Sequence, residues 1–147
     1  MPIDSFTIPL QAINDVVTKK YNVRLYVLRT DLNHPAISGN KLFKLKYNLQ
    51  EAIKNQQKTL LTFGGAFSNH IAATAAAGKE HHLTTIGIIR GDKHQEQNPT
   101  LKFAMEQGMQ LHYVSRELYH DEEELYEYVT KKFEEENAYL IPQGGGQ

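Results

Sequence analysis

The fold is decided by one stretch, Lys58-Thr59-Leu60-Leu61-Thr62-Phe63-Gly64-Gly65-Ala66-Phe67-Ser68-Asn69-His70. Its first six residues are mostly apolar or β-branched, which predicts a short buried strand. The strand runs into two glycines and then into an alanine-rich helix that we expect over residues 68–77, with Gly78 ending it. A strand, a glycine turn and a helix N-terminus together offer backbone N–H groups to an anion. We therefore expect a carboxylate or a phosphate to bind here.

A second stretch, Gly39-Asn40-Lys41-Leu42-Phe43-Lys44, precedes that strand and carries two lysines three residues apart. Apolar residues recur at helical spacing from Leu42 to Ile53, which predicts a helix over residues 42–55. Both amines then lie on one face of its first turn, where the helix dipole disfavours each positive charge by roughly 0.3 kcal/mol or more. A bound anion would compensate; otherwise both amines point into water.

The rest of the chain repeats the order of strand and helix. Apolar, β-branched runs predict strands near residues 59–63, 84–89, 110–114 and 138–141. The intervening helix signals are capping residues and an acidic first turn: Asn98-Pro99, Ser115 and Asp121-Glu122-Glu123-Glu124. Short connections favour right-handed crossovers, so we expect an α/β fold of three layers, α/β/α, around a four-stranded parallel sheet. The strand order should differ from the sequence order.

The first 40 residues give weaker signals. Residues 1–20 are predicted to be mostly irregular, with a short helix from Asn14 to Lys19. Residues 22–29 alternate in hydrophobicity and predict a strand. Residues 31–40 are rich in turn formers and form the loop that delivers Lys41.

The composition limits the classes of function. The chain of 147 residues has a formal net charge of −1 and no cysteine. Neither a basic face nor a polybasic run is visible, which argues against a nucleic-acid or membrane partner. The absence of cysteine excludes disulfides, a thiol nucleophile and a cysteine-based metal site. No signal-peptide pattern opens the chain, so we expect a cytoplasmic protein.

The two stretches together resemble a known family. Asn40-Lys41-x-x-Lys44-Leu45 followed by Gly64-Gly65-x-x-Ser68-Asn69-His70 is similar to the pyridoxal-phosphate (PLP) enzymes of the 1-aminocyclopropane-1-carboxylate (ACC) deaminase and D-cysteine desulfhydrase family. This family belongs to the tryptophan-synthase-β-like group, fold type II. The likeness extends over residues 8–145, nearly the whole chain, but over only the first half of a family member. The motifs are specific as a pair.

The resemblance implies a role for each matched residue. Lys41 matches the catalytic lysine that forms a Schiff base with PLP, and Lys44 matches a second lysine that pairs with the cofactor phosphate. Ser68 and Asn69 match residues that meet the substrate carboxylate and the ring hydroxyl of the cofactor, so Asn69 is a candidate for binding both ligands. His70 is a candidate to contact the same substrate. The alternative is a helix cap formed by Ser68 and Asn69 beside a structural histidine.

The resemblance also implies an activity and a domain organisation. The implied function is a PLP-dependent deaminase or desulfhydrase of a small amino acid, D-cysteine or ACC, with Ser68-Asn69-His70 favouring D-cysteine. Family members take their phosphate cup and ring-nitrogen partner from sequence beyond the equivalent of Gln147. We therefore expect residues 1–40 to join a large domain that is absent here and residues 41–147 to form the small domain. The chain alone should be inactive, and the full-length enzyme should be a homodimer.

Two other functions remain open. The lysines and the helix N-terminus could hold a small anion without covalent chemistry, as a binding module. A flavodoxin-like scaffold without a ligand is disfavoured by the paired lysines.

Other signals are weak. The histidines lack the spacing of a zinc site and predict solvated surface side chains: His34, His81, His82, His94, His112 and His120. No metal is therefore expected. The stretch around Ser68 is not a nucleophile elbow, because Asn69-His70 stands where that motif has a glycine.

Overall fold

Strand β3, Thr59–Gly65, lies inside a parallel sheet in the order β5-β4-β3-β6. The computed structural model describes residues 7–37, 39–91 and 98–145. Beside β3, the elements within these ranges are β1 (Leu10–Ile13), α1 (Val16–Lys20), β2 (Leu25–Leu28), α2 (Asn40–Lys54), α3 (Asn69–Glu80), β4 (Thr84–Arg90), α4 (Pro99–Glu106), β5 (Gln110–Val114), α5 (Arg116–His120), α6 (Glu122–Lys132) and β6 (Ala138–Ile141). Short 3-10 turns cover Thr30–Leu32, Glu134–Glu136 and Gln143–Gly145.

The sheet is parallel throughout, as predicted. β3 pairs with β4 from Thr59 opposite Thr84, and with β6 from Thr59 opposite Ala138. β5 continues the sheet on the far side of β4. The chain therefore leaves β3 in one direction and returns through β6 on its other side. This arrangement makes the neighbouring ends of β3 and β6 a topological switch point, where open α/β sheets bind ligands.

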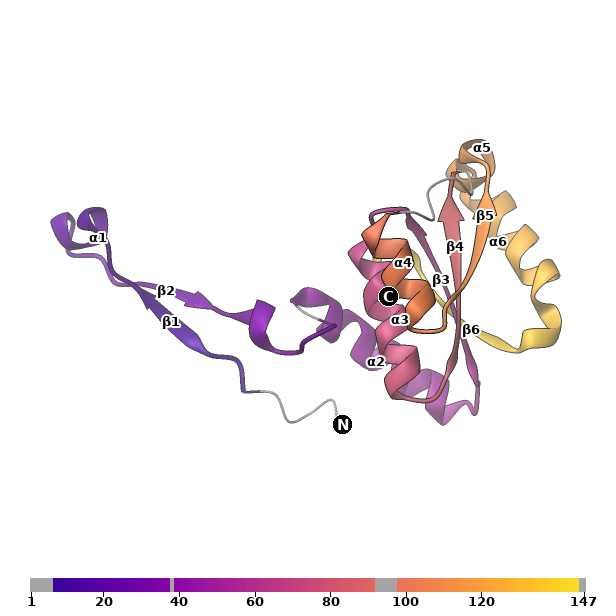
Figure 1. The fold of residues 1–147 in the computed structure, drawn as a ribbon, viewed down its shortest axis with the longest axis horizontal. Helices are drawn as coiled ribbons and strands as arrows, with labels where there is room; N and C mark the ends of the chain where they lie inside the picture. The colour runs from indigo at the N-terminus through magenta and orange to yellow at the C-terminus, as the bar shows by residue number, and fades with distance from the viewer. Residues whose placement is uncertain (1–6, 38, 92–97, 146–147) are drawn as a thin grey trace.

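Helices cover both faces of this sheet, so the prediction of three layers is confirmed (Figure 1). Leu60 points to one face and packs in a cluster with Leu45 and Ala73 of α2 and α3. Its neighbour Leu61 points to the opposite face, where it packs with Leu125 of α6. Successive strand residues alternate between the two faces, which explains why the strand residues from Thr59 to Gly64 are all buried.

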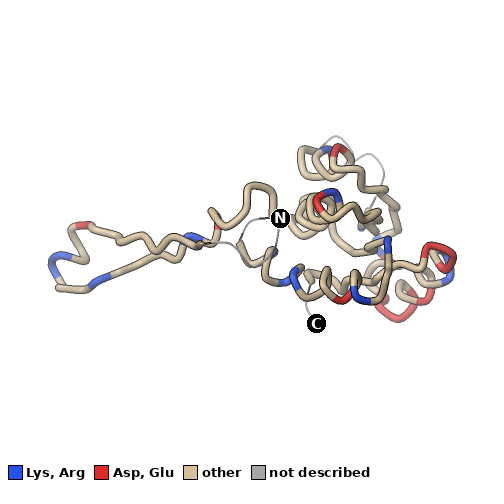
Figure 2. The backbone as a smooth tube through the Cα atoms, turned by 90° about the horizontal axis from the view of Figure 1, so that it is seen from below, with Lys and Arg blue, Asp and Glu red and all other residues tan. Residues whose placement is uncertain are grey.

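The charged helix ends also follow the prediction. Asp121 caps α6 through its side chain, which accepts from the Glu124 amide at 3.0 Å. Acidic residues fill the first turn of α6 and basic residues its last turn, an order that suits the helix dipole. In Figure 2 a stretch of backbone coloured red for Asp and Glu lies at the end of the molecule opposite to the β1–β2 segment. No helix in the described ranges is long and apolar enough to cross a membrane.

The prediction that α3 ends at Gly78 is wrong. α3 continues to Glu80, with Gly78 buried inside the helix. A Cβ atom at Gly78 would lie 2.1 Å from Cγ2 of Thr85 on β4. Glycine is required here because the helix backbone approaches the sheet closely, a long-range cause that local sequence does not reveal.

The N-terminal segment also differs from expectation. The predicted strand and short helix are present as β2 and α1, but β1 was not predicted as a strand, and it pairs with β2 in an antiparallel hairpin with Leu10 opposite Leu28. The connecting helix α1 is capped by Asp15, whose side chain accepts from the amides of Val17 and Thr18. This hairpin extends away from the sheet and its helices (Figure 1).

Candidate active site

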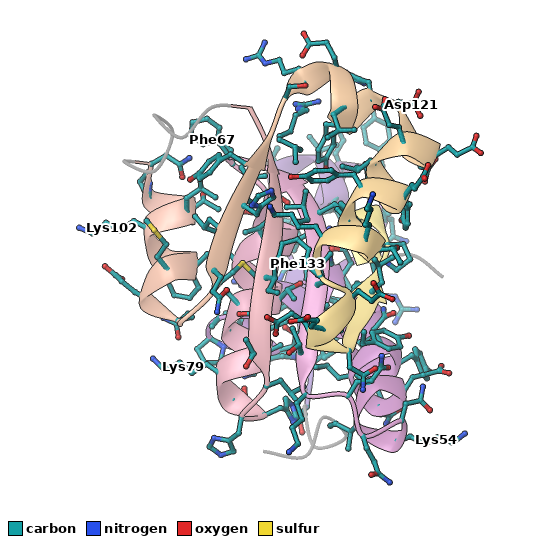
Figure 3. All side chains as sticks on the ribbon, turned by 90° about the vertical axis from the view of Figure 1, so that its right-hand side faces the viewer. Lys54, Phe67, Lys79, Lys102, Asp121 and Phe133 are labelled. Atoms are coloured by element: carbon teal, nitrogen blue, oxygen red, sulfur yellow. The ribbon has the colours of Figure 1, made fainter. Side chains whose placement is uncertain are left out.

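The candidate site lies at the carboxyl edge of the parallel sheet. Phe67, which follows β3, lies at one end of the molecule in Figure 3, whereas Lys54 and Lys79 near the ends of α2 and α3 lie toward the other. Helices in such folds run opposite to the strands, so the N-termini of α2 and α3 both face the carboxyl edge. The sequence-predicted residues are carried on these two N-termini.

Lys41 and Asn69 line one cavity of about 350 Å³. The remaining lining comes from the same two helices and the loop before α2: Ala36, Gly39, Asn40, Ala72 and Ala73. The small side chains of Ala72 and Ala73 leave this space open next to Asn69. The cavity has the size of a small-ligand site, and it brings a lysine amine and an amide together from two segments of the sequence.

The N-terminus of α2 lacks a side-chain cap among the described residues. Its N-cap is Gly39, at a positive φ of 67° that favours glycine. Lys41 and Lys44 occupy the first turn, and no acidic residue accompanies them. Backbone N–H groups without a described side-chain cap and two lysines therefore share one helix end, an arrangement that favours an anionic ligand.

Ser68 caps α3. Its hydroxyl oxygen accepts a long hydrogen bond from the Ile71 amide at 3.4 Å, which leaves the hydroxyl proton free to donate. The turn before Ser68 is held from α4, because the Asn98 side-chain amide donates to the Ala66 carbonyl at 2.8 Å. Glycine is also necessary at Gly64 near the end of β3, since a Cβ atom there would lie 2.8 Å from Oγ of Ser68.

His70 is buried, with 2% of its surface exposed, and it is not among the residues lining the cavity. Its Nε2 lies 2.8 Å from Oγ1 of Thr62, whose hydroxyl donates to the Ile141 carbonyl at 3.1 Å. The Thr62 oxygen must then accept from His70, which assigns the ring proton to Nε2. Nδ1 is a buried acceptor that has no hydrogen-bond partner among the residues that the structure describes.

The two lysines act on His70 through their charge. Burial, and then the positive charges of Lys41 and Lys44, lower the pKa of His70 from 6.5 to about 4. The imidazole is therefore neutral at physiological pH. The turn after β6 closes over this ring, because a Cβ atom at Gly145 would lie 2.9 Å from Cε1 of His70 and 3.3 Å from Cβ of Lys44. His70 thus lies between β3, β6 and the first turn of α2.

Sequence reasoning missed two residues around this site. Thr62, read only as a strand residue, holds His70. His34, predicted to be a solvated histidine, is 9% exposed and bonded to Glu80 of α3 with Nε2 to Oε2 at 3.0 Å. The surface prediction is also wrong for His112, which is partly buried and bonded to the Tyr128 hydroxyl at 3.0 Å. His94 lies outside the described residues. A histidine bonded to a distant partner leaves no local sequence signal.

Comparisons with known proteins bear on the family of the chain. No family model matches the chain. A Thermotoga maritima protein provisionally named 1-aminocyclopropane-1-carboxylate deaminase is 38% identical over 133 residues, which are 88% of this chain and 42% of that protein. An Arabidopsis thaliana protein is 34% identical over 82% of this chain and 32% of its own length. It is named bifunctional D-cysteine desulfhydrase/1-aminocyclopropane-1-carboxylate deaminase, mitochondrial.

A solved structure extends this agreement to the fold. The crystal structure of an ACC deaminase homologue matches with a TM-score of 0.76 and 27% identity, over 99% of this chain and 44% of that one. The matched part of the chain corresponds to about two fifths of the length of the Thermotoga relative. The resemblance to the ACC deaminase and D-cysteine desulfhydrase family is confirmed, and over most of its own length this chain is a relative of those proteins.

Proposed function

We propose that this chain provides the cofactor lysine of a PLP-dependent deaminase or desulfhydrase that acts on a small amino acid such as D-cysteine or ACC. The observation that carries this proposal is the cavity shared by Lys41 and Asn69 at the uncapped N-terminus of α2. The names of the relatives support the two substrates. His70 does not line the cavity, so its identity discriminates weakly between them.

The residues present fit PLP, judged by the donors around the cavity. An aldehyde requires an amine, and Lys41 lines the space. A phosphate requires cations and backbone N–H groups, which Lys44 and the N-terminus of α2 provide. A ring hydroxyl requires an amide partner, which Asn69 provides on the opposite wall. The buried Nδ1 of His70 adds one unused acceptor beside both lysines.

When bound, PLP supplies an electron sink that delocalises the electrons of a breaking bond. The chain's own residues would bind and orient the cofactor and the substrate and move the proton. Lys41 would hold the cofactor through Nζ, and its amine would also serve as the base that takes a proton from the substrate. Asn69, which lines the cavity from α3, would orient the cofactor ring. Ser68 and the amides of the first turn of α3 bind the substrate carboxylate, since the Ser68 hydroxyl still has a proton to donate.

We assign His70 a supporting role in addition to the predicted substrate contact. A neutral imidazole adds no third positive charge next to Lys41 and Lys44, and its lone pair at Nδ1 can accept a hydrogen bond from an ammonium group or from a ligand. Because Thr62 fixes Nε2, the direction of Nδ1 is also fixed.

The affinity of the 147-residue chain for PLP should be low, because the relatives are more than twice as long. A missing pair of charge-assisted hydrogen bonds to the phosphate would weaken binding by about 3–6 kcal/mol, or roughly two to four orders of magnitude. We propose that the hairpin side of the chain, residues 1–40, packs on a larger domain in full-length relatives, that residues 41–147 form the small domain, and that such proteins are homodimers.

The test is a titration with PLP followed by visible absorbance. We expect the wild-type chain to give a weak but saturable change and Lys41→Ala to give none. Lys44→Ala should keep the spectral change but raise the apparent Kd about tenfold, since it removes one ion pair with the phosphate. Reversed behaviour of the two variants would reverse their roles. Tight binding by the wild-type chain, with ammonia release from D-cysteine, would contradict the expected weakness.

A non-covalent anion site is the second candidate, because the uncapped N-terminus of α2 and its two lysines suit any small anion. Inorganic phosphate distinguishes the two functions. If phosphate protects the chain against thermal unfolding as well as PLP does, and PLP gives no spectral change that depends on Lys41, the binding module is the better account.

A further inference from the structure

The loop before α2, between Thr30 and Gly39, forms one wall of the Lys41 cavity, and a hydrogen bond joins its two ends. The Gly39 amide donates to the Thr30 carbonyl at 2.8 Å, which joins the two ends of the loop. The Asn33 side-chain amide donates to the Gly39 carbonyl at 3.3 Å from inside it. These two bonds hold the ends of the loop together, and α2 with Lys41 follows it directly.

His34 organises the interior of this loop. Its Nδ1 accepts from two backbone amides, Ala36 at 3.1 Å and Ile37 at 2.9 Å. An acceptor at Nδ1 places the ring proton on Nε2, which points to the carboxylate of Glu80 at 3.0 Å. Ile37 is buried at 3% exposure, so its amide has no solvent to replace this bond.

The same imidazole connects the two walls of the cavity. Ala36, held by Nδ1, lines the cavity on the loop side with Gly39, Asn40 and Lys41. Glu80, held at Nε2, belongs to α3, which supplies the opposite wall. Ile37 packs in the same apolar cluster as Ala73 and Ala76 of α3, which brings the loop against that helix. His34 thus connects, through hydrogen bonds, the loop wall that carries Lys41 with the helix α3 that carries Asn69.

We propose that His34 is a positioning residue that fixes the loop before α2 against α3 and so sets where the Lys41 amine stands relative to Asn69. Two bonds on Nδ1 determine the shape of the loop, and one bond on Nε2 determines its distance from α3. The part of the proposal that concerns PLP rests on the proposed function; the part that concerns the loop does not.

The experiment compares two replacements that each keep half of the imidazole's bonding. The amide oxygen of His34→Asn can occupy the place of Nδ1 and accept from the two backbone amides, as asparagine does in turns. The longer side chain of His34→Gln reaches toward Glu80 but leaves those amides without an acceptor. Amide hydrogen exchange measured by NMR at Ala36 and Ile37, thermal unfolding and the PLP titration are recorded for each variant of the 147-residue chain.

In His34→Gln we expect exchange at Ala36 and Ile37 to become about tenfold faster, as for loss of one hydrogen bond, and the PLP spectral change to weaken. His34→Asn should restore the slow exchange.

If His34→Gln fails to fold, Glu80→Ala replaces it, and it should weaken the PLP change while the two amides stay protected. Unchanged exchange in His34→Gln, or no rescue by asparagine, overturns the proposal. If the wild-type chain gives no PLP signal at all, the proposed function fails, and the exchange data still decide the role of His34 in the loop.

Discussion

His70 links the charge of the site to the stability of the fold. Its pKa is lowered from 6.5 to about 4 by burial and by Lys41 and Lys44, so the folded chain resists protonation that the unfolded chain accepts. Between pH 4 and 6.5 the unfolded state therefore binds more protons, and stability rises with pH. The contribution of His70 is fully present above pH 6.5 and is lost as the pH falls toward 4.

The rise of stability with pH can be measured by comparing the wild-type chain with a variant that lacks the imidazole. The free energy of unfolding should fall by about 2 kcal/mol more between pH 7 and pH 5 in the wild-type chain than in His70→Gln, at about 1.4 kcal/mol per pH unit inside the window. Glutamine is the matched variant because its amide can still donate to Thr62. Urea denaturation at both pH values measures the difference. Equal pH dependence in the two proteins would show that His70 already titrates normally in the folded state.

Individual site residues differ in how far the sequence reveals them. Lys41, Ser68 and Asn69 stand next to helix starts whose caps and glycines are local signals, so their places on the two helices could be predicted. The partners of the histidines could not. Glu80, the partner of His34, is 46 residues away, and Thr62, the partner of His70, is itself bonded to the Ile141 carbonyl 79 residues away. Contacts of this range are set by the packing of α3 on the loop and by the pairing of β3 with β6.

At the scale of elements, Gly78 shows how tertiary packing overrides a local rule. Replacing a helix-interior glycine with alanine normally favours the helix by about 1 kcal/mol. Gly78→Ala should instead destabilise the chain by roughly 1–3 kcal/mol, because its Cβ would lie 2.1 Å from Cγ2 of Thr85 and 3.1 Å from the Leu83 carbonyl. Thermal or urea unfolding measures the loss. The control is Lys79→Ala on the exposed side of the same helix, which should change stability by less than about 0.5 kcal/mol.

A double variant tests the cause. Thr85→Ser removes the methyl group that the new side chain would meet, so Gly78→Ala with Thr85→Ser should recover part of the lost stability relative to the sum of the single variants. Recovery should be incomplete because the Leu83 carbonyl remains. Strict additivity of the two losses would show that the contact with β4 is not why glycine stands inside α3.

At the scale of the whole molecule, the hairpin is the least covered part. Its strands place Leu10 opposite Leu28 and Ala12 opposite Tyr26, so these four side chains share one face. Leu10, Tyr26 and Leu28 are 64%, 50% and 55% exposed. An apolar face of this kind without cover is an association surface. We therefore expect the 147-residue chain to self-associate.

Sedimentation velocity over a range of protein concentrations checks this expectation. The double variant Tyr26→Lys with Leu28→Lys should shift the distribution toward monomer. The matched control, Tyr47→Lys with Ile53→Lys, adds the same charge at exposed apolar residues of α2 and should leave association in place. A monomeric wild-type chain at all concentrations, or equal effects of both double variants, would exclude the hairpin face as the cause.

The parallel sheet could be predicted from the sequence because its strands are short apolar runs that alternate with helix signals, and the two central strands β3 and β4 are almost continuously buried. The strand order followed only as a general expectation, and the hairpin was missed. Residues 10–13 are short and mixed, and their pairing depends on the distant residues 25–28. A short exposed strand lacks the hydrophobic pattern that burial gives to β3 and β4.

The central claim is that Lys41 is the lysine that bonds the cofactor. Borohydride reduction of the chain in the presence of PLP, followed by peptide mapping, tests this most directly, since reduction fixes the cofactor on whichever amine it has bonded. The account predicts a label concentrated on the peptide that contains Lys41, with Lys41→Ala losing it and Lys44→Ala retaining it. Uniform labelling over surface lysines, or a label that persists on other sites at the same level in Lys41→Ala, would contradict it.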